Sequence, residues 1–402
     1  MFKMQLPDDV NFILERMRSH GYSAHVVGGS VRDSLIGREL GDFDITTNAL
    51  PEQTKAVFSD YKTIDTGIKH GTVTLVLGGV PYEITTYRID GDYKDNRHPE
   101  AVTFTTSLTE DLARRDFTVN AMAYSVQDGL VDPFHGHRDA NVRTIRAVGD
   151  PYRRFDEDAL RILRALRFSS TLSFDIEGNT AKAARDLAPR LSSISKERVY
   201  AELKKLIAGD NAYRVIKKYG DVLSYALDGF TFERLPDKAE FLKADYLTRL
   251  GALIYMNSKD HTDAAEKLLA GLKTDKLTRT HTVSVFNAYE NNYLSDETET
   301  LRLLAAYGKD ALEGAVKLGV LTGKFTDAEE EILSLALASG RPYTISQLDI
   351  RGNDLTSLGL KGEGIGEALE TLLYAVINGE VDNEKTALIG YIAKTVRVRS
   401  TD

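Results

Sequence analysis

The sequence predicts an α+β protein, in which an N-terminal mixed β-sheet with helices is followed by an all-helical remainder. Two observations lead to this prediction. Short β-rich runs alternate with helical patterns up to about residue 148. Beyond residue 150 helical periodicity dominates, as in residues 157–168 and 197–207, and strand signals nearly vanish. With 402 residues, the chain can form two to four domains.

The elements of the N-terminal part follow from local patterns. Helices are expected from Val31 onward and over residues 51–58, where Pro51 suits a first helical turn. Gly78-Gly79 separates two β-rich runs and predicts a hairpin. Residues 89–100 are polar and contain a glycine and a proline, which predicts a mobile loop. Strands are expected over residues 25–27, 43–47, 72–77, 82–88, 102–106 and 120–126.

Domain boundaries are expected near residues 148, 205 and 305. The first marks the change from mixed to helical patterns, whereas no motif marks the other two. The predicted domains are residues 1–148, 149–205, 206–305 and 306–402.

Composition excludes several kinds of site. The chain has no cysteine, so it cannot form disulfides, zinc–thiolate sites or iron–sulfur clusters. The first 21 residues lack a continuous apolar core, so no signal peptide is expected. No segment approaches the roughly 20 apolar residues that span a bilayer, and we expect a cytoplasmic protein without a membrane partner. The net charge of −9 argues against nonspecific binding of nucleic acid over the whole surface, but it is compatible with a local basic surface.

A pair of carboxylates is the first motif with chemistry in it. Residues at positions i and i+2 of a strand point to the same face, so Asp42 and Asp44 are expected side by side. Adjacent carboxylates repel, and oxygen ligands suit Mg²⁺, which also binds substrate phosphates. Such ions can activate a 3′-hydroxyl and neutralise a leaving pyrophosphate. Glu83 is a candidate third carboxylate, although an ordinary exposed strand glutamate explains it equally well.

A glycine turn precedes this pair. Gly28-Gly29 follows a predicted strand and lets the backbone approach a ligand closely. Ser30 is expected to cap the following helix, whose N-terminus would suit a triphosphate, and Arg32 adds a fixed positive charge. An ordinary tight connection between strand and helix gives the same pattern.

The segment from Asp156 to Phe168 predicts one helix with an unusual polar face. Asp158, Arg161, Arg164 and Arg167 recur at every third position. An amphipathic helix with an i,i+3 ion pair explains this pattern structurally. The functional interpretation concerns base edges. Cytosine and adenine both present an exocyclic amine beside a ring nitrogen, which a carboxylate and an arginine can recognise.

Uracil and guanine carry a carbonyl where the amine would be, so they would leave buried groups unpaired. Asp158 and Arg161 could therefore select C and A without a template. Arg164 and Arg167 would remain for phosphates. In an earlier cluster, Arg114-Arg115 could contact the triphosphate or orient the ribose, although basic residues are common at the end of any helix.

Four segments occur in the order and approximate spacing of a known family: GGSVRD, GDFDITTNA, RRDFTVNAMAY and EDALRILRALRF. They resemble the class II tRNA nucleotidyltransferases, the CCA-adding enzymes of the polymerase-β superfamily. The segments LDIRGNDL and VINGEVDNEK resemble the C-terminal region of Bacillus-type members.

The resemblance implies a nucleotidyltransferase head with a mixed sheet, followed by a helical neck, body and tail, with the predicted domain boundaries given above. It implies stepwise addition of C, C and A to tRNA from CTP and ATP, with Mg²⁺ at Asp42 and Asp44. It leaves open whether the protein is a monomer or a homodimer. The nucleotide contacts that it implies are Gly29, Arg32, Arg115, Asp158, Arg161, Arg164 and Arg167.

Related activities remain as alternatives. Bacterial poly(A) polymerases share the head motifs but usually have a more basic C-terminal part. A-adding enzymes have similar head motifs, whereas CC-adding enzymes typically lack a flexible loop such as residues 88–100. A non-catalytic RNA-binding homologue would be expected to have lost the aspartates or arginines, and neither is lost. His261 is followed by Thr262-Asp263, which is not the His-Asp pair of a phosphohydrolase.

Exposed basic residues of the helical part are candidates for RNA contacts, although ordinary solvated side chains explain them as well. The candidates are Lys204, Lys205, Lys217, Lys218, Lys394, Arg397 and Arg399.

Overall fold

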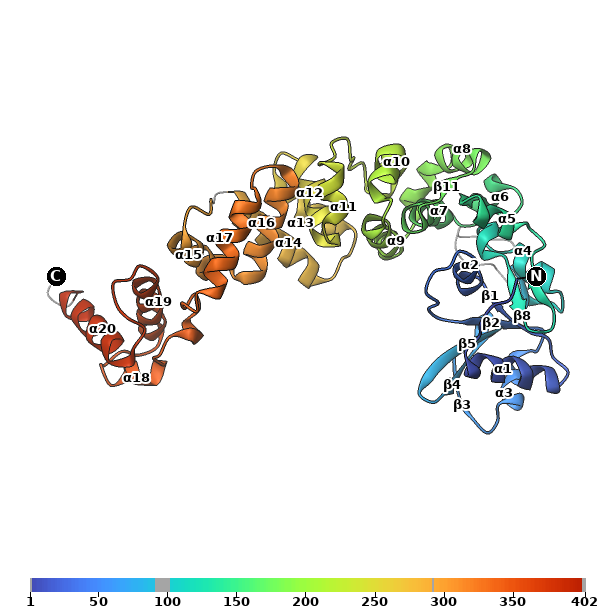
Figure 1. Cartoon of the computed structure of the whole chain (residues 1–402), viewed down its shortest axis with the longest axis horizontal. Helices are drawn as coiled ribbons and strands as arrows, with labels where there is room; N and C mark the ends of the chain where they lie inside the picture. Colours follow the sequence, from blue (N-terminus) through green and yellow to red (C-terminus); the bar gives the residue numbers. More distant parts are fainter. Residues whose placement is uncertain (1, 91–101, 291–292, 400–402) are drawn as a thin grey trace. The chain divides into compact units, whose positions relative to one another are not determined.

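The computed structural model describes residues 2–90, 102–290 and 293–399. It divides into two compact units, Met1–Thr231 and Phe232–Asp402 (Figure 1). The predicted α+β class is confirmed, because a mixed sheet precedes a run of helices. Residues 91–100 of the predicted loop lie outside the described residues. The division into head, neck, body and tail stays a prediction.

One mixed sheet organises the first unit. Among the described residues it has seven strands in the order β3-β4-β5-β2-β1-β8-β9. The β2–β5 pair is parallel, and the other neighbours are antiparallel. The strands are β1 Ala24–Val27, β2 Asp44–Thr47, β3 Lys62–Gly67, β4 Thr72–Leu77, β5 Val80–Thr86, β8 Ala123–Ser125 and β9 Gly129–Val131. Two smaller pairs join β6 Arg88–Asp90 to β7 Val102–Phe104 and β10 Thr144–Ile145 to β11 Asp175–Ile176.

The predicted hairpin between β4 and β5 is confirmed. Leu77 pairs with Val80 across Gly78-Gly79, and both glycines have positive φ, +55° and +89°. A two-residue turn of this kind matches the twist of the flanking strands and favours glycine. The sequence therefore placed this turn correctly from local chemistry alone.

Apolar packing on one sheet face decides where the polar residues of β2 point. Ile45 lies in a core with Val10 and Ile13 of α1, Asp8–Ser19. Because side chains alternate along a strand, Asp44 and Thr46 face the opposite side. There the hydroxyl of Thr46 lies 3.3 Å from a carboxylate oxygen of Asp111.

Some helices of the first unit contact the sheet, and others pack mainly against one another. They are α1, α2 Gly29–Leu35, α3 Pro51–Val57, α4 Leu108–Ala113, α5 Gly136–Asn141, α6 Pro151–Glu157, α7 Leu160–Leu172, α8 Gly178–Asp186, α9 Lys196–Ala208 and α10 Ala212–Ala226. Short 3₁₀ helices cover Ile68–His70, Thr118–Asn120 and Ala188–Ser193. Helix α7 packs against α9 and α10 through buried side chains that include Leu163 and Leu166.

The prediction of one helix from Asp156 to Phe168 is wrong. Helix α6 ends at Glu157, and α7 begins at Leu160. Asp158 between them has extended backbone angles, φ −147° and ψ 103°. Its carboxylate accepts a hydrogen bond from the backbone N–H of Leu160 at 3.0 Å. The aspartate thus stabilises the start of a new helix, as carboxylates at such ends commonly do.

The second unit is helical in its described residues. Helices α12, α14 and α16 pack together through buried side chains that include Leu253 and Phe286. None of the helices described in either unit has both the length and the apolarity to cross a membrane. The helices of this unit are α11 Lys238–Lys243, α12 Tyr246–Met256, α13 His261–Gly271, α14 Lys276–Glu290, α15 Glu297–Tyr307, α16 Lys309–Thr322, α17 Asp327–Ala338, α18 Gly352–Thr356, α19 Glu363–Ile377 and α20 Lys385–Arg399, with a 3₁₀ turn at Ile345–Gln347.

A buried polar chain ties β1 to the end of β5. Nε2 of His25 lies 2.8 Å from the carboxylate of Asp128, so we assign the ring proton to this nitrogen. Nδ1 then accepts from the hydroxyl of Tyr87, 2.9 Å away. Burial lowers the pKa of His25 below its ordinary 6.5, although Asp128 opposes the shift. The folded protein consequently holds His25 neutral.

This arrangement predicts acid sensitivity. The folded protein binds the His25 proton more weakly than the unfolded chain does. Neutral His25 therefore contributes fully to the free energy of unfolding above pH 6.5, and this contribution is lost as pH falls through the lowered pKa. The thermal midpoint should therefore fall less between about pH 7.5 and 5.5 in His25→Gln than in the unchanged protein. The exposed His70→Gln variant serves as control and should keep the original slope. An unaltered slope in His25→Gln would contradict this account.

Candidate active site

The turn between β1 and α2 brings the backbone close to an arginine from another segment. Gly28 has φ +77°, a region that favours glycine. A Cβ atom there would lie 3.2 Å from Nη1 of Arg115. The prediction that Ser30 caps the helix is wrong, because α2 already begins at Gly29. The hydroxyl of Ser30 instead lies 3.4 Å from the carbonyl oxygen of Val27.

Asp42 and Asp44 lie at the start of β2. The strand begins at Asp44, so Asp42 precedes the strand rather than sharing it as predicted. Both residues are exposed. Surrounding protein atoms nevertheless raise the pKa of Asp44; Arg115 opposes this shift, and the charge of Asp42 adds to it. The two carboxylates therefore repel each other, and a bound cation would relieve that repulsion.

Glu83 does not complete a three-carboxylate cluster. It lies on β5, one residue before Ile84, which pairs with Ile45 of β2. Within the described residues, no three His, Cys, Asp or Glu side chains are grouped closely enough to hold a metal ion. Asp42 and Asp44 thus remain as the predicted metal ligands among the described residues.

Asp111 anchors the two arginines that follow α4. Its side chain is fully buried and lies 2.9 Å from Arg114 and 3.5 Å from Arg115. The Nε atom of Arg115 is buried and has no hydrogen-bond partner among the described residues. Arg115 therefore keeps an unpaired donor at Nε, and its Nη1 lies where the missing side chain of Gly28 leaves space.

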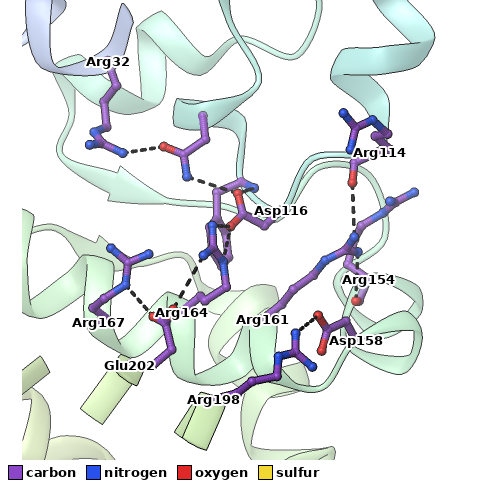
Figure 2. A network of polar contacts seen from close by, with 12 residues as sticks. Arg32, Arg114, Asp116, Arg154, Asp158, Arg161, Arg164, Arg167, Arg198 and Glu202 are labelled. Carbon is purple, nitrogen blue, oxygen red and sulfur yellow. Dashed lines mark hydrogen bonds and ion pairs between the residues drawn. The ribbon is translucent and has the colours of Figure 1, made fainter. Parts of the chain in front are cut away.

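A chain of polar contacts links α2 to α7 (Figure 2). Arg32 donates to the side-chain oxygen of Asn120 at 2.5 Å, and the amide of Asn120 donates to Asp116 at 3.1 Å. One carboxylate oxygen of Asp116 also lies 2.7 Å from Nε and 2.6 Å from Nη2 of Arg164. Burial acts to raise the pKa of Asp116, but Arg164 and Asn120 outweigh it and lower the pKa to about 2. The carboxylate is thus held in its charged form.

The chain continues to α9. Glu202 lies 3.6 Å from Arg164 and 2.5 Å from Arg167 (Figure 2). Arg164 and Arg167 are therefore not free side chains awaiting phosphate, as the sequence suggested. Both guanidinium groups are already held in place by carboxylates.

Asp158 and Arg161 are not paired with each other. Asp158 pairs with Arg198 of α9 at 2.7 Å. Arg161 instead pairs with Glu157 at 2.8 Å and donates to the backbone carbonyl oxygens of Arg154 and Arg114, both at 3.2 Å (Figure 2). The ion pair expected within one helix is absent because Asp158 lies outside α7. The carboxylate and the guanidinium are positioned by different neighbours.

Most of the predicted site residues line one cavity of about 550 Å³. Asp42 and Arg167 are not among its lining residues. Its lining residues are Gly28, Gly29, Arg32, Asp44, Arg88, Arg114, Arg115, Asp116, Asn120, Asp158, Leu160, Arg161, Arg164, Phe168 and Arg198.

Several residues that organise this cavity were not singled out from the sequence. Asp116 and Asn120 lie within the motif RRDFTVNAMAY, and Asp111 lies three residues before it, but the sequence assigned none of them a role. Glu202 carried a usable signal, since it lies on the buried face of α9 beside Val199 and Leu203. A glutamate on an apolar helix face usually needs a cationic partner. Arg198 carried no comparable signal, because its partner lies 40 residues away in the sequence.

Comparisons with known proteins agree with this geometry. Models of the poly(A) polymerase head domain and of tRNA nucleotidyltransferase domain 2 match residues 24–146 and 249–392. A model described as a probable RNA and SrmB binding site of polymerase A matches residues 173–219. The CCA-adding enzymes of Geobacillus thermodenitrificans and Leuconostoc mesenteroides are each 37% identical to this chain, over 96% of both sequences.

Solved structures agree as well. The crystal structure of Bacillus stearothermophilus CCA-adding enzyme in complex with CTP matches with a TM-score of 0.84 and 32% identity, covering 99% of this chain and 100% of that one. Thermotoga maritima CCA-adding enzyme complexed with tRNA, at 20% identity and a TM-score of 0.67, shares the fold over 97% of this chain and 96% of that one. Since the identity to the first relatives extends over nearly the whole of both sequences, this chain belongs to the CCA-adding enzyme family of nucleotidyltransferases.

Proposed function

We propose that this chain adds C, C and A in turn to the 3′ end of tRNA, from CTP and ATP, with release of pyrophosphate. The observation that carries this proposal is one cavity lined by Asp44, Arg115, Asp158 and Arg161. Such a cavity can hold a nucleotide with its phosphates near the carboxylate pair and its base near the other two residues. The family membership supports the same reaction.

Nucleotidyltransferases of this family use divalent metal ions, and we assign Mg²⁺ to Asp42 and Asp44. The ligand set is oxygen only, which suits Mg²⁺. Burial is the main cause of the raised pKa of Asp44 and the charge of Asp42 adds to it, so a bound cation would stabilise both carboxylates in their charged form. When bound, the metal would activate the RNA 3′-hydroxyl and neutralise charge on the leaving pyrophosphate.

We assign the triphosphate to the arginine wall of the cavity. Arg115 supports this assignment most directly, because its buried Nε has no partner among the described residues. Gly29 allows close approach of the backbone. Arg32 and Arg164 are held by Asn120 and Asp116, so they present fixed positive charge in this wall that needs little reorganisation. Arg167 does not line the cavity, and its assigned nucleotide contact would require it to leave Glu202.

Asp158 and Arg161 would recognise the base. A carboxylate accepts from the exocyclic amine of C or A, and a guanidinium donates to the adjacent ring nitrogen. U and G would place a carbonyl against Asp158 and a ring N–H against Arg161. Those unpaired groups account for their rejection without a template.

The RNA partner would be tRNA in the cytoplasm, bound largely through its phosphates. Lys204, Lys205, Lys217 and Lys218 are exposed on α9 and α10, and Lys394 is exposed on α20. The side chains of Arg397 and Arg399 lie outside those that the structure describes.

A gel assay tests the reaction itself. A tRNA transcript ending before CCA should grow by three residues only when Mg²⁺, CTP and ATP are all supplied. A long ladder with ATP alone would instead identify a poly(A) polymerase. Extension only of a transcript that already ends in CC would identify an A-adding enzyme, and no product would favour a non-catalytic RNA-binding protein.

Loss of either aspartate of the carboxylate pair should stop turnover. In Asp42→Asn and Asp44→Asn, kcat should fall by about a thousandfold or more, because several kcal/mol of transition-state stabilisation would be lost. Binding of tRNA, measured by filter retention, should persist. Asp65→Asn, an exposed carboxylate on β3 of the same sheet, is the matched control. Turnover retained in both variants would refute the metal assignment.

Removal of the base-reading carboxylate should relax nucleotide choice. In Asp158→Ala, the ratio of kcat/KM for UTP to that for CTP should rise by about tenfold or more, because one discriminating contact is lost. Asp156→Ala, which removes an exposed carboxylate two residues earlier, should leave the ratio unchanged. If C and A remain strongly preferred in Asp158→Ala, the base-reading assignment fails.

A further inference from the structure

Both oxygens of the Asp158 carboxylate are engaged. One accepts from the backbone N–H of Leu160 at 3.0 Å, and the other accepts from Arg198 at 2.7 Å. The two side chains are mostly buried, with 15% of Asp158 and 25% of Arg198 exposed. Both line the cavity. The orientation of this carboxylate is therefore fixed from two sides.

Arg198 comes from a different helix than any residue assigned to base reading. It belongs to α9, whereas Arg161 belongs to α7 and has its own partners in Glu157 and two backbone carbonyls. Figure 2 shows Arg198 reaching Asp158 from the side of Glu202, apart from the contacts of Arg161. The guanidinium of Arg161 thus does not determine how Asp158 is oriented.

The orientation matters because a carboxylate recognises an amine through a lone pair with a direction. Each carboxylate oxygen has two lone-pair sites, so a bond to Arg198 leaves one site on that oxygen. Rotation about the last side-chain torsion of aspartate is soft. Without Arg198, only the helix-capping bond to Leu160 would hold the group.

We propose that Arg198 is a specificity-determining positioning residue, which holds the Asp158 carboxylate so that its remaining lone pair meets the exocyclic amine of C or A. This inference rests on the proposed base-reading role of Asp158. Arg198 acts through Asp158 and donates nothing to the reacting atoms. The opposing view is that Arg198 merely ties α9 to the junction between α6 and α7.

The two views differ in which substrates are affected. The test compares CTP with a pyrimidine nucleoside triphosphate that lacks the 4-amino group, and with UTP, in the full-length protein with Mg²⁺ and a tRNA acceptor. If Arg198 acts on the amine through Asp158, Arg198→Ala should lose most of the preference for CTP over the amine-free analogue. The kcat/KM ratio of UTP to CTP should also rise by about tenfold or more. A purely structural contact would lower kcat/KM equally for all three.

Matched variants make the result specific. Arg190→Ala removes an arginine that pairs with Asp156 in the same region but does not line the cavity, and it should change neither ratio. Arg198→Lys keeps a donor and a positive charge, and it should restore part of the preference. Arg198→Ala added to Asp158→Ala should cause no further loss of discrimination.

Equal losses for all three triphosphates in Arg198→Ala, with the preference for the amine intact, would overturn the inference. That result would leave the proposed function standing, provided that the unchanged protein adds C and A selectively. If Arg198→Ala fails to fold, kcat/KM for the same three triphosphates is compared in the Arg198→Lys and Arg198→Gln variants. Failure of the unchanged protein to add nucleotides would reject the proposed function instead.

Discussion

The ion pair between Asp116 and Arg164 is the contact on which the rest of the cavity depends. Asp116 directly follows Arg115, and Arg164 lies in the middle of α7, so the pair joins two walls of the same cavity. The Asp116 carboxylate also accepts hydrogen bonds from the backbone N–H of Phe117 and from the side-chain amide of Asn120. Its hydrogen-bonding capacity is thus used although the side chain is only 8% exposed. A buried charge of this kind is stable only with such partners. If one wall moved away from the other, it would leave a buried charge unpaired, which costs several kcal/mol of free energy.

Local charge balance also reconciles an acidic chain with an arginine-rich site. The net charge is −9, yet arginines dominate the cavity wall. Asp111 pairs with Arg114 and Arg115, and Asp116 and Glu202 pair with Arg164, which compensates part of this charge. A wall built in this way is held rigid before any ligand arrives, which is the condition under which fixed charges stabilise developing charge most effectively.

The sequence predicted elements whose causes are local and missed those whose causes are distant. The Gly78-Gly79 turn depends on neighbouring residues alone, and it was predicted correctly. The order of strands, with β2 parallel to β5, depends on packing across the chain and was not predicted. The pairing of Asp158 with Arg198 depends on a residue from α9, which periodicity cannot reveal. Most of the predicted site residues nevertheless line one cavity, because the motifs that contain them meet there.

The break between α6 and α7 gives one side chain two duties. Asp158 begins α7 through its bond to the backbone of Leu160, and the same carboxylate faces the cavity. Asparagine could keep the bond to Leu160 through its carbonyl oxygen but would turn an amide NH2 donor toward the cavity, and alanine would lose both the bond and the acceptor. The start of α7 and the choice of nucleotide therefore depend on one residue, and of these two substitutions only asparagine would separate them.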